Sequence, residues 1–398
     1  MLPSPTGRPP HESGRVTLNK TVLAVRGGMT EYEVLVVGPE SRDTGGVAQY
    51  VREQRRRLPE RVGVDVHDTA APSGSGALWL LRFVAATLLT ALRFPLRERP
   101  DLVHVHTSHG VAFYRAAWYV LVASALWRSP VVLHVHGSSF DEFVAGDPPL
   151  ARQVFDRCSA VVVLSPYWRE ALADHVEPAA LVVVPNAVEA NRYAPSYDAD
   201  PPHVAFVSNL IERKGVTEFA AALERVQASH EFKVDIAGDG PLAPVATDLA
   251  ETYPDVEYHG YVSEQRKREL LERATVYALP THAEGLPIAL LEGMAGGAAV
   301  VTTGVGAIPG VIGPENGVLV EPGNTDALVE ALGSLLEDPE KAVAMGRANR
   351  ALVEDRYDWP AVVERLANVY DRVLAGEPLP ETGSPVESRP APGAVADQ

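Results

Sequence analysis

The chain has 398 residues, of which 35 are Lys or Arg and 52 are Asp or Glu, so its formal net charge is −17. Such an acidic chain is a poor candidate for sequence-independent nucleic-acid binding, which requires a basic surface. A single Cys excludes a disulfide framework and any zinc site built on cysteines. The hydrophobic fraction of 46% is typical of globular domains, and the length predicts two or three of them.

The two ends of the chain differ in composition from its body. Residues 1–28 show no sustained apolar period and no signal-peptide layout. A strand-like segment follows directly after Met29, so we expect these residues to form a loose arm or to precede a true start at Met29. Residues 377–398 are rich in Pro, Glu, Ser and Gly, and we expect a disordered tail because such a segment buries little apolar surface.

Between the ends, short apolar runs alternate with helical patterns in two series. The first series of predicted strands covers residues 33–37, 102–106, 131–136, 160–164 and 181–184, and the second covers 204–207, 232–237, 276–279, 299–301 and 318–320. Strands that are apolar throughout are typical of parallel sheets covered on both faces. Strand–helix alternation predicts βαβ units, so the predicted fold class is α/β with two Rossmann-like, doubly wound domains.

The domain boundary is predicted from composition. Residues 191–202 are polar and rich in Pro with no period, which is typical of a linker. The domains would then cover residues 29–190 and 203–355. Doubly wound sheets bind ligands at the carboxyl ends of their strands, so we expect a shared ligand in a cleft between the domains.

Two helical segments, 78–92 and 111–127, are unusually apolar. Each is interrupted by an arginine, Arg82 or Arg115, and each is shorter than the roughly 20 residues of a membrane span. We favour buried helices that pack on the sheet. The alternative is a surface that docks on a bilayer near a lipid-linked substrate.

The strongest functional signal lies at residues 281–297, where a strand is followed by a loop and a glycine-rich helix. The helix is expected to begin near Pro287, and its free N–H groups would form an anion site. Glu284 lies in the loop and Glu292 on the helix. A carboxylate can accept two hydrogen bonds from a vicinal diol, as in sugar and ribose binding. Two glutamates alone would be interpreted as solvated, but this placement favours a binding site.

Two further loops follow strands. At residues 208–215, Arg213 and Lys214 have the charge to neutralise a diphosphate, although a charged surface turn has the same pattern. At residues 43–47, Gly45 and Gly46 would let the backbone approach a ligand, or would simply form a tight turn. A full G-x-G-x-x-G fingerprint is absent from this loop, which counts against a nicotinamide enzyme.

Four histidines fall at the ends of two predicted strands: His104, His106, His134 and His136. In strand alternation His134 and His136 share one face, and His136 is nearest the strand end. We expect His136 to hydrogen-bond a ligand and His104 and His134 to lie in the core. No carboxylate spacing supports a metal site, and none is predicted.

Glycine turns follow two strands of the second series, at Gly238 and at Gly260-Tyr261. These glycines are typical of ordinary turns, or they would let the backbone approach a nucleobase closely. Cys158 precedes a buried strand, so a core position is favoured over a nucleophile. The sequence contains no G-x-S-x-G elbow, P-loop or H-E-x-x-H motif.

Taken together, these motifs resemble the family-4 retaining glycosyltransferases, which have the GT-B fold of two facing Rossmann-like domains. The resemblance covers residues 33–374. It is carried by motifs in the family's order, at residues 45–47, 100–106, 134–137, 183–188, 214–215 and 237–241 and at Glu284-x7-Glu292.

The resemblance implies hexosyl transfer from a nucleotide-diphosphate sugar with retention at the anomeric carbon. It implies that Glu292 binds the ribose hydroxyls, Glu284 the donor-sugar hydroxyls and Lys214 the diphosphate. His136 would touch the donor sugar near the reacting carbon, so His136, Lys214 and Glu284 form the predicted catalytic group. The other donor-binding residues it implies are Gly45, Gly46, Asn209, Arg213, Gly238, Tyr261, Gly285 and Leu286.

The resemblance also carries expectations about partners. No metal or cofactor is expected, because cationic side chains and a helix dipole stabilise the leaving phosphate in this fold. The acceptor would be a glycan or a lipid-linked hydroxyl, and the protein would be cytoplasmic with peripheral contact to the inner face of the membrane. Residues 356–376 would form a helix that packs back on the first domain. Asn209 stands where the family often has Arg, so Lys214, with Arg213, would carry the leaving-group charge.

Three alternatives stay open at this point. One is a sugar-nucleotide epimerase of the same architecture. A phosphorylase would need a pyridoxal-phosphate lysine, and none of the five lysines has a supporting motif. The third is a non-catalytic nucleotide-sugar-binding subunit, which the Asn209 departure leaves open.

Overall fold

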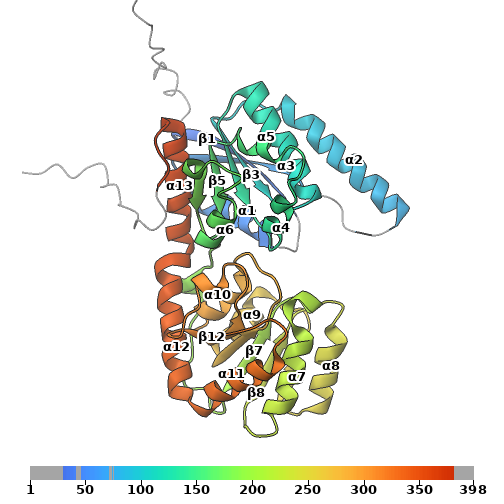
Figure 1. Cartoon of the computed structure of the whole chain (residues 1–398), viewed down its shortest axis with the longest axis vertical. Coiled ribbons are helices and arrows are strands. Elements are labelled where there is room, and N and C mark those ends of the chain that lie inside the picture. Colours follow the sequence, from blue (N-terminus) through green and yellow to red (C-terminus); the bar gives the residue numbers. More distant parts are fainter. Residues whose placement is uncertain (1–29, 42–45, 71–73, 75, 381–398) are drawn as a thin grey trace, which may run out of the picture.

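The computed structural model describes residues 30–41, 46–70, 74 and 76–380. The predicted arm, Gly45 and most of the predicted tail lie outside these residues. The described chain forms two α/β domains that stack along the long axis (Figure 1), which confirms the predicted fold class.

Within the described residues, the first domain contains a parallel sheet of six strands in the order β2-β1-β3-β4-β5-β6. Its strands are β1 Tyr32–Gly38, β2 Val62–Asp68, β3 Leu102–Thr107, β4 Val131–Val135, β5 Ala160–Val163 and β6 Leu181–Val183. The sequence pattern did not predict β2, an edge strand in which most residues are only partly buried. The strands in the middle of the sheet are buried throughout, as expected for a sheet covered on both faces.

Helices cover both faces of this sheet. The helical elements of the first domain are α1 Gly46–Arg57, α2 Ala77–Arg93, α3 Val111–Leu121, α4 Phe140–Ala145, α5 Ala151–Phe155 and α6 Pro166–Ala171, with short helical segments η1 Phe94–Leu96, η2 Val122–Trp127 and η3 Pro178–Ala180. One face packs against α1 and the carboxyl-terminal helix α13, for example through Tyr50 and Leu366. The other packs against α3 to α5, through residues such as Phe113 and Phe140.

The second domain has the same α/β architecture as the first. Its described strands run in the order β12-β11-β10-β7-β8-β9. They are β7 His203–Val207, β8 Lys233–Ala237, β9 Val256–Tyr258, β10 Val276–Leu279, β11 Ala299–Thr303 and β12 Gly317–Val320. The helical elements are η4 Ala190–Arg192, η5 Glu212–Lys214, α7 Val216–Val226, α8 Ala243–Thr252, α9 Glu264–Glu272, α10 Ile288–Ala295, η6 Ile308–Gly310, α11 Thr325–Glu337, α12 Pro339–Leu352, η7 Val353–Tyr357 and α13 Trp359–Ala375. The short edge strand β9 was also not predicted from the sequence.

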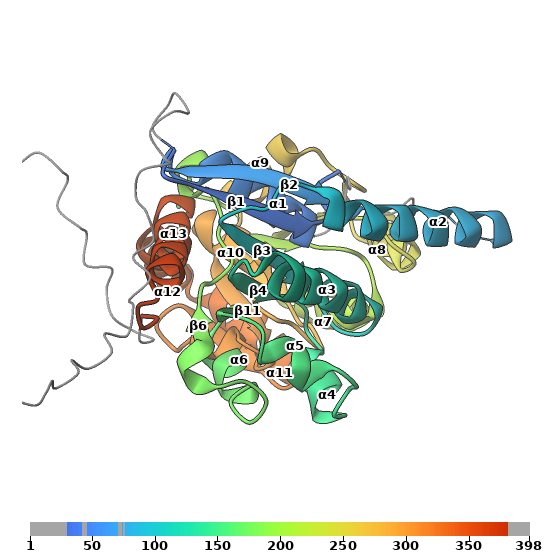
Figure 2. The same cartoon turned by 90° about the horizontal axis from the view of Figure 1, so that it is seen from above.

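The last two helices join the domains. Figure 1 shows α12 along the second domain and α13 continuing along the first, and Figure 2 shows the two nearly superposed in the view from above. On the first domain, the Tyr32 hydroxyl donates a 2.7 Å hydrogen bond to Asp371, and Gln54 donates a 2.8 Å bond to the Tyr370 hydroxyl. The chain therefore returns to the first domain after completing the second.

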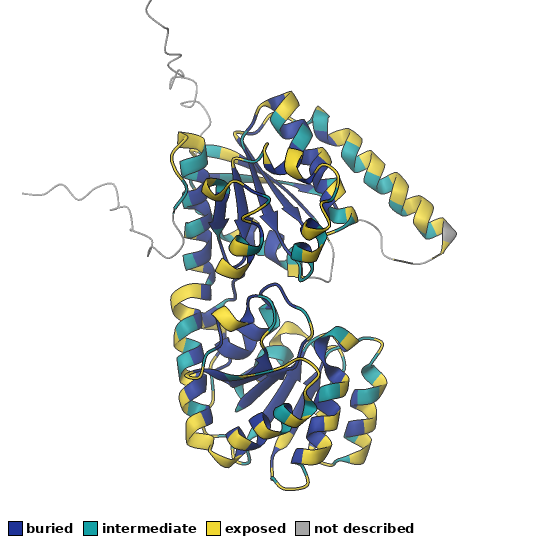
Figure 3. Ribbon diagram, in the orientation of Figure 1, coloured by how far each residue is buried: buried dark blue, intermediate teal, exposed yellow. Residues whose placement is uncertain are grey.

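The two apolar segments have different positions. The prediction of a buried helix holds for α3, where Phe113, Ala116 and Val120 pack into the core. It is wrong for α2: every residue from 78 to 93 is at least partly exposed, and Figure 3 shows the helix standing out from the first domain. By length and composition, the described residues contain one stretch that could cross a membrane, Leu78–Leu96, with 19 residues and a mean hydropathy of 1.4.

Candidate functional site

A cleft of about 430 Å³ lies where the carboxyl ends of strands from both domains face each other. Its size falls in the range of small-molecule sites. The cleft brings together all the predicted site residues that the structure describes: Gly46, His136, Asn209, Arg213, Lys214, Gly238, Tyr261, Glu284, Gly285, Leu286 and Glu292. Gly45 lies outside the described residues. The predicted residues come from loops far apart in the sequence, so the fold assembles the site.

Glu284 lies in the loop after β10 and is nearly buried. Its Oε1 accepts hydrogen bonds from Lys214 Nζ at 2.5 Å, Arg213 Nη1 at 3.2 Å and the Thr281 hydroxyl at 3.2 Å. Burying a carboxylate is costly unless charged or polar donors satisfy it, and these three do. The contacts hold the Glu284 side chain beside the two cations.

The loop that carries Lys214 is held against the end of β10 by a glycine. Gly215 has φ of +72°, and a Cβ there would lie 1.9 Å from the carbonyl oxygen of Pro280. Only glycine combines that backbone conformation with so close an approach. Between the same two loops, the amide of His282 donates a 2.8 Å hydrogen bond to the carbonyl of Arg213. Lys214 is therefore positioned by backbone contacts on both sides.

A second glycine fixes the Glu284 loop from behind. A Cβ on Gly306, which has φ of +55°, would lie 1.9 Å from the Glu284 carbonyl oxygen. The next residue, Ala307, donates its amide to the Gly285 carbonyl at 3.1 Å. The loop after β11 thus supports the loop after β10.

Glu292 lies on α10, facing the cleft, and is nearly buried. Its Oε1 accepts a 2.7 Å hydrogen bond from Lys267 on α9, and Lys267 also pairs with Glu264 at 2.9 Å. Burial raises the pKa of the Glu292 carboxyl, and the Lys267 ammonium opposes that shift. Lys267 was not predicted as a site residue, because nothing in the local sequence indicates its pairing with a residue 25 positions later.

The first domain contacts the Glu284 loop directly. The side-chain amide of Asn186 donates to the Leu286 carbonyl at 2.6 Å, and a Cβ on Gly285 would lie 3.0 Å from the Gly137 carbonyl oxygen. Asn186 belongs to the motif at residues 183–188, for which no individual role was predicted. These contacts bring His136, at the end of β4, to the same cleft.

His136 ends a chain of buried hydrogen bonds. Its Nε2 lies 2.9 Å from Nδ1 of His106, whose Nε2 lies 2.8 Å from Oε1 of Gln54 on α1. Gln54 in turn donates to Nδ1 of His104, at 2.9 Å, and to the Tyr370 hydroxyl. Burial lowers the pKa of His136 to about 3 and that of His104 to about 3, so these rings are neutral at physiological pH.

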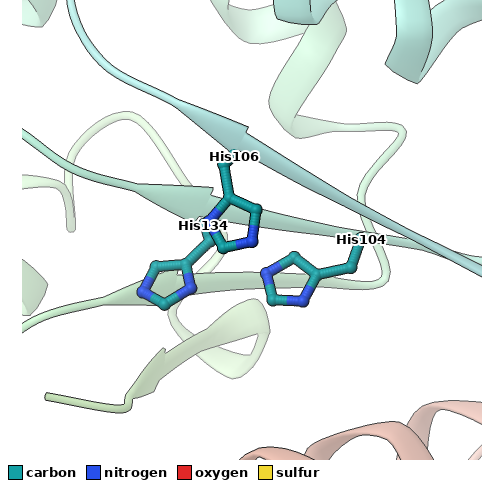
Figure 4. A group of neighbouring side chains, drawn as sticks. All are labelled: His104, His106 and His134. Carbon is teal, nitrogen blue, oxygen red and sulfur yellow. The ribbon is translucent and has the colours of Figure 1, made fainter. Parts of the chain in front are cut away.

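The histidine cluster is poorly arranged for a metal ion. Figure 4 shows His104, His106 and His134 side by side across β3 and β4, and their nearest ring nitrogens lie within 4.8 Å of one another. The rings stack, with interplanar angles of 14° to 30°. Imidazole lone pairs lie in the ring plane, so stacked rings do not aim them at one point. A second group with possible metal ligands, Asp235 with Glu257 and His259, is centred on the Asp235 carboxylate, which already accepts two hydrogen bonds from Arg273.

Two known protein families match this chain, one in each domain. Residues 23–187 match the family described as "Glycosyl transferase 4-like domain", and residues 201–338 match "Glycosyl transferases group 1". Glycogen synthase of Mycobacterium tuberculosis (strain ATCC 25618 / H37Rv) is 26% identical over 314 residues, which is 74% of each chain. A GDP-mannose-dependent monoacylated alpha-(1-6)-phosphatidylinositol monomannoside mannosyltransferase of Corynebacterium glutamicum is 28% identical over 68% of this chain and 78% of its own.

Solved structures share the fold. Sucrose-phosphate synthase from Thermosynechococcus elongatus superposes with a TM-score of 0.69 at 19% identity, covering 87% of this chain and all of that one. Anabaena HepE in complex with UDP superposes with a TM-score of 0.67 at 17% identity, covering 85% and 99%. The two matched halves, the relatives and the paired parallel sheets agree. The chain belongs to the GT-B glycosyltransferases that join a 4-like amino-terminal domain to a group 1 carboxyl-terminal domain.

Proposed function

We propose that the protein is a family-4 enzyme that transfers a sugar from a nucleotide-diphosphate donor, bound in the interdomain cleft, with retention at the anomeric carbon. The observation that carries the proposal is the convergence of two nearly buried carboxylates, Glu284 and Glu292, with the cations Arg213, Lys214 and Lys267 in one cleft. Carboxylates suit the hydroxyls of ribose and sugar, and cations suit the diphosphate.

We assign the donor residues as follows. Glu292 accepts the ribose hydroxyls, and Glu284 accepts hydroxyls of the transferred sugar. Lys214 and Arg213 bind the diphosphate, where Asn209 adds a hydrogen bond without charge. The backbone of Gly46, Gly285 and Leu286 approaches the phosphates and sugar. Gly238 and Tyr261, which also line the cleft, are assigned to contact the nucleoside.

The chemistry that we propose is electrostatic. Breaking the anomeric C–O bond places negative charge on the diphosphate, and the fixed cations, with the amino-terminal end of α10, lower that barrier. The leaving phosphate oxygen takes the proton from the acceptor hydroxyl on the same face of the sugar, which accounts for retention without a protein nucleophile. Neutral His136 hydrogen-bonds the sugar near the reacting carbon. These cations supply the positive charge that a metal would otherwise supply, so we propose catalysis without metal or cofactor.

The acceptor is proposed to be a glycan or a lipid-linked hydroxyl that approaches from the first domain. We place the enzyme in the cytoplasm with peripheral contact to the inner face of the membrane. Two relatives suggest such acceptors: one is named a glycogen synthase and another acts on a phosphatidylinositol mannoside.

A panel of nucleotide sugars tests the donor assignment. A bound donor stabilises the folded chain by mass action, by about 2.7 kcal/mol at a concentration 100 times its Kd. We expect at least one UDP- or GDP-sugar to raise the melting temperature and to be hydrolysed or transferred. A shift with no turnover on any acceptor would favour the non-catalytic binding subunit, and no shift with any donor would contradict the proposal.

A further inference from the structure

Helix α2 carries an apolar surface with no covering element in the described part of the chain. Leu78, Leu80, Leu81, Leu88, Leu89 and Leu92 are each between 53% and 68% exposed. Their spacing spreads them over about half the circumference of the helix, along its whole length. Soluble monomers rarely expose a continuous apolar surface of this kind without an interaction that covers it.

The carboxyl-terminal half of α2 contacts the first domain on the side opposite the leucines. The indole nitrogen of Trp118 on α3 donates to the Ala91 carbonyl at 3.1 Å, and the Thr87 hydroxyl is buried. Residue Phe94, directly after α2, is fully buried against Tyr119 and Trp127. The carboxyl-terminal half of the helix is therefore attached to the domain, and α2 cannot cross a bilayer without breaking these contacts.

The charge on this part of the chain is opposite to that of the whole. Residues 69–97 contain no Asp or Glu and three arginines, within a chain of net charge −17. Arg82 and Arg93 lie three helical turns apart on the same side of α2, at the edge of the leucine face. Basic residues beside an apolar helix face are typical of helices that lie in the plane of an anionic membrane surface.

The neighbouring helix extends this surface with interfacial residues. Tyr114 and Trp118 lie one turn apart on α3 and are 41% and 43% exposed. Tyrosine and tryptophan favour the boundary between headgroups and acyl chains. A second copy of the chain is a poorer fit, because protein interfaces carry about one hydrogen bond per 100–200 Å² and the leucine face offers no such group. Two copies meeting there would also bring arginine edges of the same charge together.

From these observations we infer that α2 lies in the plane of an anionic lipid bilayer, with its leucine face in the acyl region and Arg82 and Arg93 at the headgroups. The helix starts on the cleft side of the first domain, after β2, whose carboxyl end faces the same way as that of β4 (Figure 1). A bilayer that covers the start of α2 therefore lies at the same end of the first domain as the cleft. The further statement that the acceptor is embedded in that bilayer rests on the proposed function, whereas the docking itself does not.

Vesicle flotation of the full chain, without donor or acceptor, tests the docking. We expect the wild type to float with vesicles of equal parts phosphatidylcholine and phosphatidylglycerol, and to bind phosphatidylcholine alone more weakly. Combined Leu81→Gln, Leu88→Gln and Leu92→Gln changes should weaken binding at least about tenfold. Combined Arg82→Gln and Arg93→Gln changes should weaken binding to the anionic vesicles by roughly fivefold per arginine. Leu374→Gln, which changes an exposed leucine on α13, is the matched control and should float as the wild type does.

Two measurements keep the outcomes separate. The donor-induced shift in melting temperature should be the same in the leucine variant as in the wild type, which shows that the variant is folded and that the cleft is intact. Equal flotation of the wild type and the leucine variant would overturn the inference. So would sedimentation equilibrium showing a dimer that the leucine changes dissociate. If the wild type floats as expected but binds no donor in the panel, the proposed function is refuted and the docking inference is not.

Discussion

Lys214 donates a 2.5 Å hydrogen bond to Glu284, although the two residues are 70 positions apart and follow different strands. Both side chains are nearly buried in the interdomain cleft. Each side chain neutralises the charge of the other, which would be costly to bury without a partner. The same pair offers a cation to a diphosphate and a carboxylate to sugar hydroxyls, so the two halves of the proposed donor meet at this contact.

Replacing Lys214 tests its role in catalysis. Lys214→Ala removes the cation closest to Glu284, and we expect kcat to fall by about 10²–10³, the usual effect of losing one group that stabilises developing charge. Initial-rate kinetics with the donor found by the panel will measure it. Lys233→Ala, at an exposed position on β8, is the control and should leave kcat unchanged. Wild-type turnover in Lys214→Ala would refute the assignment.

Lys267 is expected to control the pH range of donor binding. Because burial raises the pKa of Glu292, donor affinity that needs its carboxylate is present above that pKa and is lost as the pH falls through it. In Lys267→Met the opposing cation is gone, so the pKa should rise further and affinity should be lost at a higher pH. Isothermal titration of the nucleotide across pH 5 to 8 will show the shift. An unchanged profile, equal to that of the exposed Lys341→Met control, would contradict the pairing.

The buried histidines predict sensitivity to acid. Burial lowers the pKa of His104, His106, His134 and His136, so the unfolded chain binds protons below about pH 6.5 that the folded chain does not. The stability they contribute is therefore complete above about pH 6.5 and is lost as the pH falls toward their folded pKa values. Each group adds a slope of at most about 1.4 kcal/mol per pH unit.

A single variant isolates this effect. Neither ring nitrogen of His134 has a hydrogen-bond partner in the described part of the chain, so His134→Leu should change stability at pH 7 by no more than about 1 kcal/mol. Its loss of stability between pH 6.5 and 4 should be shallower than that of the wild type, as measured by denaturant unfolding. An identical pH slope in the two proteins would show that His134 does not titrate on unfolding.

The glycine behind the Glu284 loop gives a structural test of the site. Gly306→Ala places a methyl group 1.9 Å from the Glu284 carbonyl in a left-handed conformation, so the loop must move. We expect donor affinity to fall at least about tenfold, or by about 1.4 kcal/mol, because the displaced loop moves Glu284 away from the donor hydroxyls. Gly310→Ala, in the same loop region with open space at its Cβ, should bind donor normally. Equal affinities in the two variants would mean that the Glu284 loop tolerates displacement.

Much of the fold was predictable because its central strands are apolar along their whole length. The edge strands β2 and β9 were missed, since β2 is only partly buried and β9 has three residues. The predicted buried position of α2 was wrong for a different reason. Both α2 and α3 are strongly apolar, and composition alone does not distinguish a helix packed on the core from an exposed one.

The site was predictable where its residues fall in ordered motifs, as Lys214 and Glu284 do. It was not predictable where a contact depends on the packing of separate elements. Lys267 reaches Glu292 because α9 and α10 lie side by side, and Gln54 reaches His106 from α1. Neither residue lies in a motif that indicates the pairing.

The most direct measurement is the anomeric configuration of the product, followed by NMR as the wild type and Glu292→Gln consume the donor identified by the panel. We expect the wild type to give a product with the anomeric configuration of the donor. Glu292→Gln, which cannot offer a carboxylate to the ribose, should need at least about tenfold more donor for the same rate. Inversion in the wild type, or an unchanged donor requirement in Glu292→Gln, would contradict a retaining glycosyltransferase whose donor lies in this cleft.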